Sequence, residues 1–477
     1  MKRGAKLDLN VLQPKLLAAV KDIAALMRDA GGRALMVGGS VRDLLLGVTE
    51  VKDVDLEVFG IQPADLQRIL GAKYPFDPCG VSFGVLKIQH LDIDVSLPRR
   101  ESKRGEGHKG FLIDSDPNLS IAEAASRRDF TINAMYYDPL AETFEDPYGG
   151  QDDLAARILR HVSPKFVEDP LRVLRGMQFI ARFDLHPAPE TIDICRTMQI
   201  EGLPPERLFE EWAKLLTKGV QIGRGLAFLR ATGWVKYFPE LQRLIGCEQD
   251  PKWHPEGDVW NHTCLCLDAF ARHRAARKTS APDVNWHDED LIVGLAVLCH
   301  DFGKPATTAY DPVKKHIRSL GHDVAGAAPT LSFLRRLTNE ERILRDVPPL
   351  VTNHMQPYAL WKGKVGDAAV RRLALKVVRI DRLIRVAHAD DEGRPPECRG
   401  GTSAGEDLVW LEQTAERLRI AAEAPKPILM GRHLMALGHK PSKQFKVWLD
   451  ACFEAQLDGA FSDVDGALAY FKEHVIR

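Results

Sequence analysis

The sequence predicts an α+β protein in which a small mixed head is followed by all-α domains. Short β-like runs alternate with short helical segments between residues 34 and 150, whereas the pattern from about 151 onward is helical. At 477 residues the chain is too long for a single hydrophobic core, so we expect several domains. We find no internal repeat and no low-complexity tract in the sequence.

Bulk composition is that of a folded globular chain, with 45% hydrophobic and 27% charged residues. No apolar run reaches the roughly 18 residues of a membrane helix, and the N-terminal MKRGAKLDLN lacks the apolar core of a secretory signal. The eight cysteines are scattered without a CxxC pair, which favours reduced thiols over a disulfide frame or a zinc ribbon. We therefore expect a cytoplasmic protein with no membrane partner; its oligomeric state stays open.

The formal net charge is only −1. A protein that is nearly neutral overall can bind nucleic acid only through local positive patches. The sequence offers clusters of basic residues at Arg99, Arg100, Lys103 and Arg104, at Arg127 and Arg128, and at Arg172 and Arg175.

The first helix is expected over 13–29, where apolar residues have helical spacing and Gly31-Gly32 provides a stop. Strand-like runs follow at 34–37, 54–59, 84–89 and 91–97, and the mixed region closes near Tyr148-Gly149-Gly150. Breaks in composition then predict four domains: 1–150, 151–245, 246–395 and 396–477.

A glycine turn links the first predicted strand to the next helix, in the order Val37-Gly38-Gly39-Ser40-Val41-Arg42-Asp43. Two glycines let the backbone turn tightly and approach a phosphate. Ser40 is expected to cap the helix, whose N-terminus favours an anion, and Arg42 to reach a triphosphate. An ordinary strand–turn–helix is the alternative interpretation of this turn taken alone.

Asp53 and Asp55 alternate with apolar residues in the following strand-like run. Residues i and i+2 of a strand face the same side, so the two carboxylates are expected to point together. Such a pair is costly unless a cation lies between them, and Mg²⁺ suits oxygen ligands and in-line phosphoryl transfer. A solvent-facing strand edge is the alternative, which the preceding glycine turn disfavours.

GGSVRDLLLG followed by KDVDLEVF resembles the nucleotidyltransferase superfamily that includes DNA polymerase β, in its tRNA nucleotidyltransferase and bacterial poly(A) polymerase branch. The resemblance implies a polymerase β-like head. It also implies that Gly38, Gly39, Ser40 and Arg42 bind the incoming nucleotide and that Asp53 and Asp55 bind catalytic Mg²⁺. A third carboxylate is implied, with Asp94 and Glu101 as rival candidates.

Two further motifs extend the resemblance. SRRDFTINA implies that Arg128, Asp129 and Asn133 belong to the nucleotide site, although an RRD string alone is usually a surface ion-pair cluster. EDPLRVLR implies that Asp169 and Arg172 select the incoming base, with Arg175 nearby. A capped helix with internal ion pairs is the alternative for that string.

Histidines and aspartates of the third domain follow the order H…HD…D of the HD phosphohydrolase superfamily, which HPEGDVWNHT and CHDFGKP resemble. The resemblance implies a divalent metal (Ni²⁺, Co²⁺, Mn²⁺ or Mg²⁺) on His262, His300, Asp301 and Asp390, with Asp391 a rival to Asp390. It implies second-ion roles for His322 and His354 and a phosphate-neutralising role for Lys304. A bound metal would activate water for phosphoester hydrolysis.

Together these motifs predict template-independent addition of CMP and AMP from CTP and ATP to the 3′ end of tRNA, with a separate phosphohydrolase activity. The tail, 396–477, is expected to contact tRNA through basic side chains. Two alternatives stay open. One is a poly(A) polymerase or an enzyme that adds only CC or only A. The other is an HD phosphohydrolase whose head binds RNA without catalysis.

Overall fold

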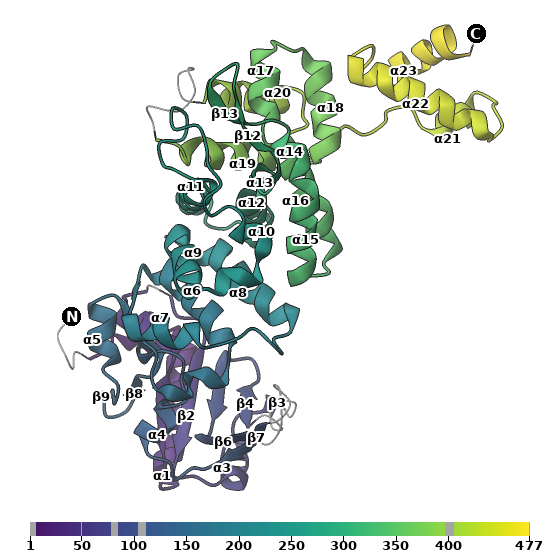
Figure 1. Cartoon of the computed structure of the whole chain (residues 1–477). Coiled ribbons are helices and arrows are strands. Elements are labelled where there is room, and N and C mark those ends of the chain that lie inside the picture. Colours follow the sequence, from purple (N-terminus) through teal and green to yellow (C-terminus); the bar gives the residue numbers. More distant parts are fainter. Residues whose placement is uncertain (1–5, 49, 78–83, 104–110, 396–404, 477) are drawn as a thin grey trace. The chain divides into compact units, whose positions relative to one another are not determined.

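The computed structural model describes residues 6–48, 50–77, 84–103, 111–395 and 405–476 (Figure 1), and the side chains of 100–103 and 111–114 lie outside the description. The chain divides into two compact units. The first comprises residues 1–211 with 227–234, and the second comprises 212–226 with 235–477. The four-domain division stays a prediction.

A seven-stranded sheet forms the framework of the first unit, in the order β3-β4-β5-β2-β1-β8-β9. Its β2 and β5 are parallel, and the other neighbouring pairs are antiparallel. The strands are β1 (Arg33–Val37), β2 (Val54–Phe59), β3 (Phe76–Asp77), β4 (Val85–Ile88), β5 (Ile93–Ser96), β8 (Tyr136–Asp138) and β9 (Thr143–Glu145). The hairpin β6 (Arg99–Lys103) and β7 (Phe111–Ser115) forms a separate small sheet.

Burial explains why β1 and β2 lie in the middle of this sheet. Leu35, Met36 and Val37 of β1 are almost completely buried, as a central strand requires. Helix α1 (Pro14–Asp29) begins with proline at its first turn and buries one apolar stripe that includes Val20, Ile23 and Met27. The predicted helix over 13–29 and the four predicted strands are present: the strand over 54–59 matches β2 at both ends, and the ends of the others differ by at most two residues.

Short helices complete the first unit: α2 (Gly39–Leu45), α3 (Pro63–Gly71), α4 (Ile121–Ala125), α5 (Gly150–Ala155), α6 (Leu171–Phe183) and α7 (Pro189–Arg196). Two strands, β10 (Ile158–Leu159) and β11 (His186–Pro187), form a parallel pair. Helix α6 is strongly amphipathic, and its buried face includes Val173, Met177 and Ile180. Helices α8 (Pro205–Lys218) and α9 (Ile222–Ala231) include the points at which the chain passes between the units.

The second unit is helical apart from the hairpin β12 (Thr308–Asp311) and β13 (His316–Ser319). At its centre α12 (His287–Cys299) is buried from Asp290 to Cys299, as expected of a helix that is apolar on all sides. The same unit contains the helices α10 (Pro239–Gln242), α11 (Val259–Ser280), α13 (Lys304–Thr307), α14 (His322–Ala325), α15 (Ala327–Leu337), α16 (Glu341–Asn353), α17 (Gln356–Lys362), α18 (Asp367–Val377), α19 (Ile380–Glu392) and α20 (Glu406–Arg417).

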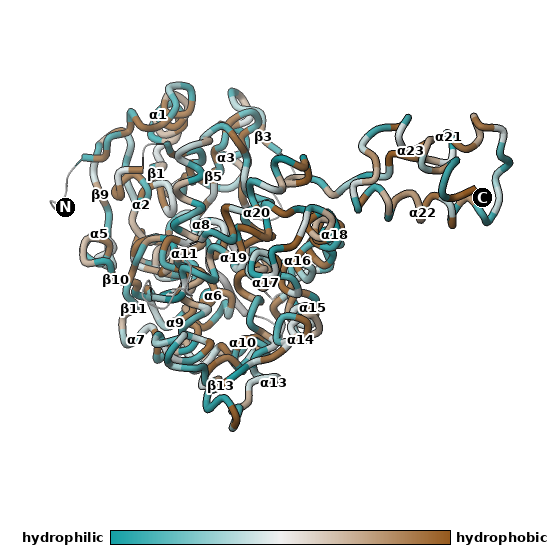
Figure 2. Tube along the Cα trace, turned by 90° about the horizontal axis from the view of Figure 1, so that it is seen from above, coloured by the Kyte–Doolittle hydropathy of each residue, from teal (hydrophilic) through white to brown (hydrophobic). Residues whose placement is uncertain are grey.

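The C-terminal helices have an apolar cluster of their own. Leu434 of α21 (Gly431–Ala436), Cys452 of α22 (Lys443–Asp458) and Ala467 of α23 (Val464–Tyr470) are buried in it together with Phe471. Figure 2 shows hydrophobic and hydrophilic residues mixed along these helices, as in amphipathic helices. Among the described residues, no helix combines the length and apolarity needed to span a membrane.

Candidate functional site

Strand pairing in the first unit gathers carboxylates at one place in the sheet. Asp55 of β2 is in register with Asp94 of the parallel neighbour β5 and with Val37, the last residue of β1. Side chains in register on adjacent strands lie on the same face. Asp53 immediately precedes β2 rather than lying within it, and its side chain is exposed. The structure thus brings Asp94 next to Asp55, whereas Glu101 lies in β6 with its side chain outside the described residues.

The electrostatics of Asp55 suit a cation. Its side chain reaches solvent, yet the protein packed around it raises its pKa; Arg128 opposes this shift, and the charges of Asp94, Asp53 and Glu57 add to it. Ionisation of Asp55 is therefore less favourable than that of a free carboxyl group, even with Arg128 nearby. A divalent ion among these carboxylates would relieve the repulsion, so the donor set fits a metal such as Mg²⁺.

The glycine turn lies over Asp55. Gly38 has a φ of 77°, and a Cβ at this position would stand 3.4 Å from both Asp55 Oδ2 and Arg128 Nη1. A side chain here would be strained by the backbone and would fill the space above the carboxylate. The expected helix cap is wrong: α2 begins at Gly39 with Gly38 as N-cap, and the buried Ser40 hydroxyl donates to the Val37 carbonyl. Ser40 lies inside the first turn, where its hydroxyl cannot reach a later amide.

A buried polar network joins the RRDFTINA segment to α2 and α6. Arg42, only 4% exposed, donates to Asn133 Oδ1 at 2.5 Å, and Asn133 Nδ2 donates to Asp129 Oδ1 at 3.0 Å. Asp129 also accepts from Arg175 Nε at 2.8 Å. Burial alone would raise the pKa of Asp129, but Arg175, Asn133 and the Phe130 amide lower it. Arg42 and Arg175 therefore hold together Asn133 and Asp129, which were predicted to belong to the nucleotide site, and Arg42 does not extend into solvent.

Asp169 and Arg172 flank the start of α6. Asp169 Oδ1 accepts from the Leu171 amide at 3.1 Å, and its Oδ2 accepts from Arg207 at 3.0 Å. Arg172 donates to the backbone carbonyls of Lys165 (2.9 Å) and Arg127 (2.6 Å). Both side chains are engaged with the protein, and Asp169 binds the first amide of the helix. Base reading would require them to exchange these bonds for bonds to a nucleotide.

In the second unit, histidine, cysteine and carboxylate side chains from three helices form one cluster. His262 and Cys266 of α11, His300 at the end of α12 and Asp390 of α19 have ligand atoms within 4.8 Å of one another. A second group, Asp301, His322 and His354, meets the same criterion. The six predicted metal-site residues of this region are therefore brought together. Asp390 Oδ1 lies 3.0 Å from His262 Nε2, whereas the rival Asp391 pairs with Arg394.

Hydrogen bonds orient the four imidazoles in the same sense. Each Nδ1 faces an oxygen that can only accept: Glu256 for His262, and the carbonyls of Val297, Ser319 and Val351 for His300, His322 and His354. In the neutral form of each ring the proton therefore lies on Nδ1, and the Nε2 lone pair faces inward, where it can bind a metal. His322 Nε2 and His354 Nε2 are 3.2 Å apart, so a proton or a cation must separate them. This is the arrangement of metal-binding imidazoles.

Asp301 connects the two groups. Its Oδ2 lies 3.3 Å from His300 Nε2 and its Oδ1 lies 3.5 Å from His322 Nε2. Lys304 is buried, pairs with Asp301 Oδ2 at 2.7 Å and donates to Gln249 Oε1. The charge of Lys304 is thus balanced by Asp301 in this structure, and its predicted phosphate contact stays a prediction.

Three members of the cluster were not anticipated from the sequence. Glu256 accepts from both His254 and His262, and Cys266 Sγ lies 3.4 Å from His262 Nε2. Burial would raise the pKa of the Cys266 thiol, but His262 and His300 lower it. The spacing of Cys266 was a usable signal, because residues i and i+4 of a helix share a face. The Glu256 contact depends on the fold of an irregular segment and has no such pattern.

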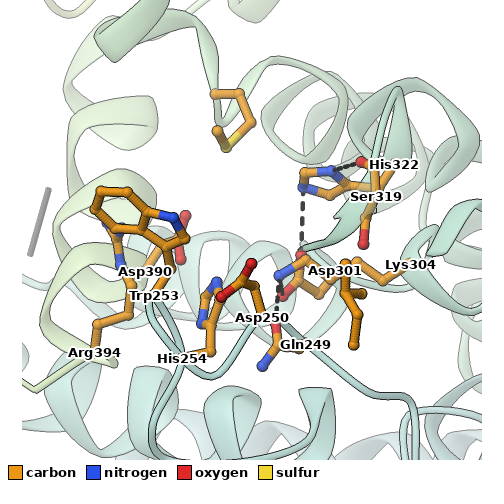
Figure 3. A pocket seen from close by; sticks show the side chains of 12 residues that line it. Gln249, Asp250, Trp253, His254, Asp301, Lys304, Ser319, His322, Asp390 and Arg394 are labelled. Carbon is orange, nitrogen blue, oxygen red and sulfur yellow. Dashed lines mark hydrogen bonds and ion pairs between the residues drawn. The ribbon is translucent and has the colours of Figure 1, made fainter. Parts of the chain in front are cut away.

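A pocket of about 280 Å³ opens onto this cluster (Figure 3). Asp301, Lys304 and His322 lie on one side, and Trp253, Asp390 and Arg394 lie on the other. The pocket thus combines potential metal ligands, two cationic side chains and an indole that is 43% exposed. Cations suit a phosphoryl group, and an exposed aromatic ring suits a nucleobase.

Comparison with known proteins identifies the family. Residues 34–160 match the poly A polymerase head domain. The multifunctional CCA protein of Xylella fastidiosa (strain 9a5c) is 35% identical over 408 residues, which cover 80% of this chain and 89% of that protein. That of Acidovorax sp. (strain JS42) is 36% identical over 376 residues, covering 75% and 82%. The chain is a member of the multifunctional CCA protein family. This membership confirms the resemblance to tRNA nucleotidyltransferases, and nucleotidyl transfer in the family implies a divalent metal.

Solved structures support the same fold. The Bacillus stearothermophilus CCA-adding enzyme in complex with CTP has a TM-score of 0.61 and 22% identity, covering 97% of this chain and 98% of that one. The Thermotoga maritima CCA-adding enzyme complexed with tRNA has a TM-score of 0.60 and 18% identity, covering 99% of both chains. The predicted fold class, a polymerase β-like head followed by helical domains, is confirmed.

Proposed function

We propose that this multifunctional CCA family member adds CMP and AMP from CTP and ATP to the 3′ end of tRNA in the cytoplasm. The observation that carries the proposal is the register of Asp55 with Asp94 beneath the Gly38 turn, within a head that matches the family. Relatives that align over most of the chain are named multifunctional CCA proteins. Similar folds come from CCA-adding enzymes in complex with CTP, ATP or tRNA.

In the head, Asp53, Asp55 and Asp94 are the residues that would hold Mg²⁺. When bound, the metal would lower the pKa of the attacking 3′-hydroxyl and stabilise the charge of the departing pyrophosphate. Gly38 leaves the approach to Asp55 open, so that a triphosphate can come close to the carboxylates. Arg128 lies between Gly38 and Glu57 and supplies a positive charge at the same place.

Nucleotide choice is assigned to Asp169 and Arg172. An Asp accepts and an Arg donates at a base edge, so the pair can favour the exocyclic groups of cytosine and adenine over those of uracil and guanine. Arg175 holds Asp129, and Arg42 holds Asn133. These bonds connect α6 and α2 through one buried network, which would keep the template helix at a fixed distance from the glycine turn.

A product ladder tests the proposal and separates it from its closest alternatives. The full-length protein is incubated with Mg²⁺ and a tRNA that lacks the terminal CCA, with CTP alone, ATP alone, or both. We expect addition to stop after CCA only when both nucleotides are present. A long adenylate ladder would identify a poly(A) polymerase. A stop after CC or after a single A in the reaction that contains both nucleotides would identify an enzyme that adds only part of CCA. No incorporation would favour a non-catalytic, RNA-binding head.

A second activity is supported by the inward-facing Nε2 atoms of His262, His300, His322 and His354. We infer that this region binds a divalent metal and hydrolyses phosphoesters of RNA ends, either phosphomonoesters or 2′,3′-cyclic phosphates. Asp301 contacts both ligand groups and would serve two ions. Hydrolysis of a 2′,3′-cyclic mononucleotide with Ni²⁺, Co²⁺, Mn²⁺ or Mg²⁺ is the test. Absence of hydrolysis with all four metals would leave the cluster a structural element.

A further inference from the structure

Cys266 occupies a position among the predicted metal ligands that no HD-type motif assigns. It follows His262 by one turn of α11, so both side chains point from the same face of the helix. Its Sγ atom lies 3.4 Å from His262 Nε2. The sulfur belongs to the same compact group of ligand atoms as His300 and Asp390. The side chains of Cys266 and His262 are both completely buried.

A glycine next to Cys266 leaves room for its sulfur to lie close to the end of α19. Gly393 ends α19, and a Cβ at that position would stand 2.2 Å from Cys266 Sγ and 3.1 Å from the Cys266 amide nitrogen. Only a residue without a side chain lets the sulfur reach the last turn of α19. That turn carries Asp390, whose carbonyl oxygen is 3.8 Å from Sγ. The glycine thus brings the sulfur and the Asp390 carboxylate to one site.

A second observation points to a ligand at this site. His300 is 1% exposed, and no described residue offers its Nε2 a hydrogen bond of good geometry. A buried polar atom without a partner is costly. Because Nδ1 of His300 faces the Val297 carbonyl, the lone pair of the neutral ring is on Nε2, which faces the carboxylates of Asp301 and Asp390. A metal ion would satisfy the nitrogen and the carboxylates together.

We propose that Cys266 is a thiolate ligand of the metal in this cluster, completing a set of His262, His300, Asp390 and sulfur. The proposal rests on the inferred metal site of the phosphohydrolase region and adds to it a choice of metal. On binding, the thiol releases its proton to solvent and the sulfur donates an electron pair to the ion. Thiolate is a soft ligand, so the site should prefer Co²⁺, Ni²⁺ or Zn²⁺ to Mg²⁺. The competing interpretation is that Cys266 only fills space in the core.

Optical titration of the full-length, metal-stripped protein with Co²⁺ separates the two interpretations. A thiolate bound to Co²⁺ gives a charge-transfer band in the near ultraviolet, whereas the d–d bands in the visible report any bound Co²⁺. We expect both in the wild type and expect excess Mg²⁺ to leave both in place. Cys266→Ser should lose the charge-transfer band, retain d–d bands and bind Co²⁺ at least ~10-fold more weakly by calorimetry. Cys264→Ser, two residues earlier in α11, is the matched control and should keep the band.

The outcomes separate this inference from the metal site on which it rests. Co²⁺ bound with d–d bands but no charge-transfer band in the wild type would overturn the role of Cys266 and leave the metal site intact. A band that survives in a folded Cys266→Ser protein would also overturn it, because the band would come from another cysteine. No Co²⁺ binding by the wild type would overturn the metal site and the inference together. The first and last outcomes are measured on the wild-type protein, so they do not depend on whether Cys266→Ser folds.

Discussion

At the scale of single residues, the surroundings of Asp55 disfavour its negative charge. Although the Asp55 side chain reaches solvent, the folded protein raises its pKa, first through desolvation by the protein packed around it and then through Asp94, Asp53 and Glu57, while Arg128 opposes the shift. A carboxyl group whose pKa is higher in the folded than in the unfolded chain costs stability as pH rises through and above its unfolded pKa. Asp55 therefore destabilises the metal-free head near neutral pH. A residue retained at such a cost is a candidate for function.

Asp55→Asn is expected to separate stability from activity. Nucleotide incorporation should fall by at least ~10³-fold, because a ligand of the catalytic metal is lost. The melting temperature of the metal-free protein should stay the same or rise, because a repelled charge is removed. Incorporation kinetics and a melting curve are the measurements. Asp92→Asn, at an exposed carboxylate just before β5, is the control and should leave both unchanged. Near-normal incorporation by Asp55→Asn would refute the metal assignment.

Arg172→Ala tests whether α6 begins with a protein template. If Arg172 donates to the base, its loss should narrow the preference for CTP and ATP over UTP and GTP by one to two decades, since a charge-assisted hydrogen bond is worth about 1.5–3 kcal/mol. The measurement is kcat/KM for the four nucleotides. Arg182→Ala in the same helix is the matched control and should not alter the ratios. Unchanged ratios with a lowered melting temperature would mean that Arg172 only ties Lys165 and Arg127 to the helix.

Sequence spacing was sufficient for residues that share one element and insufficient for residues brought together by pairing. Asp53 and Asp55 are two residues apart, so their proximity follows from the chain alone, although Asp53 lies just before β2 and not within the strand as predicted. Asp94 joins Asp55 through the register of two strands, which no local pattern specifies. Asp390 and Asp391 were equivalent in the sequence. On α19, Asp390 contacts His262, whereas Asp391 forms an ion pair with Arg394. Cys266 shows the opposite case: it was not predicted, although helical spacing alone could have placed it beside His262.

At the scale of elements, the glycines at which two backbone segments lie close together determine where the proposed ligands lie. Periodicity located β1, β2 and α1 because their burial follows the chain's own apolar pattern. It failed at the start of α2, where Gly38 rather than Ser40 is the N-cap, since the turn geometry depends on a positive φ that a motif does not reveal. Gly303 is a comparable position in the second unit. A Cβ there would meet the His322 carbonyl oxygen at 2.0 Å and the Gly326 amide at 2.7 Å.

Gly303→Ala should therefore disturb the start of α14, which carries His322. The obstruction is backbone rather than a flexible side chain, so we expect a loss of about 1–3 kcal/mol in the free energy of unfolding. We also expect weaker binding of the second metal ion. Gly366→Ala, where a Cβ would meet nothing within 4 Å, is the control and should change stability far less. Denaturant unfolding and metal titration are the measurements. If Gly303→Ala were as stable as the control, the contact would not constrain α14.

At the scale of the whole molecule, the carboxylates of the head and the histidine cluster belong to different compact units. Each unit has its own buried interior: the first includes Val37, Ala134 and Tyr136, and the second includes the buried helix α12. Cooperative units that are each stabilised by a core can lose a site without losing the other fold. This organisation predicts that the two proposed activities can be removed one at a time.

The double change His300→Ala with Asp301→Ala tests that separation. It removes two proposed metal ligands and leaves Lys304 without its carboxylate partner, so metal-dependent hydrolysis of 2′,3′-cyclic phosphates should fall to background. CTP and ATP addition to tRNA should change by no more than about twofold, which corresponds to ~0.4 kcal/mol in the barrier, because the substituted residues lie in the other compact unit. Asp55→Asn is the reciprocal variant and should keep hydrolysis while losing incorporation. Both rates are measured on one preparation of each protein, with circular dichroism as the folding control. A parallel loss of both activities in well-folded variants would show that the two sites depend on each other.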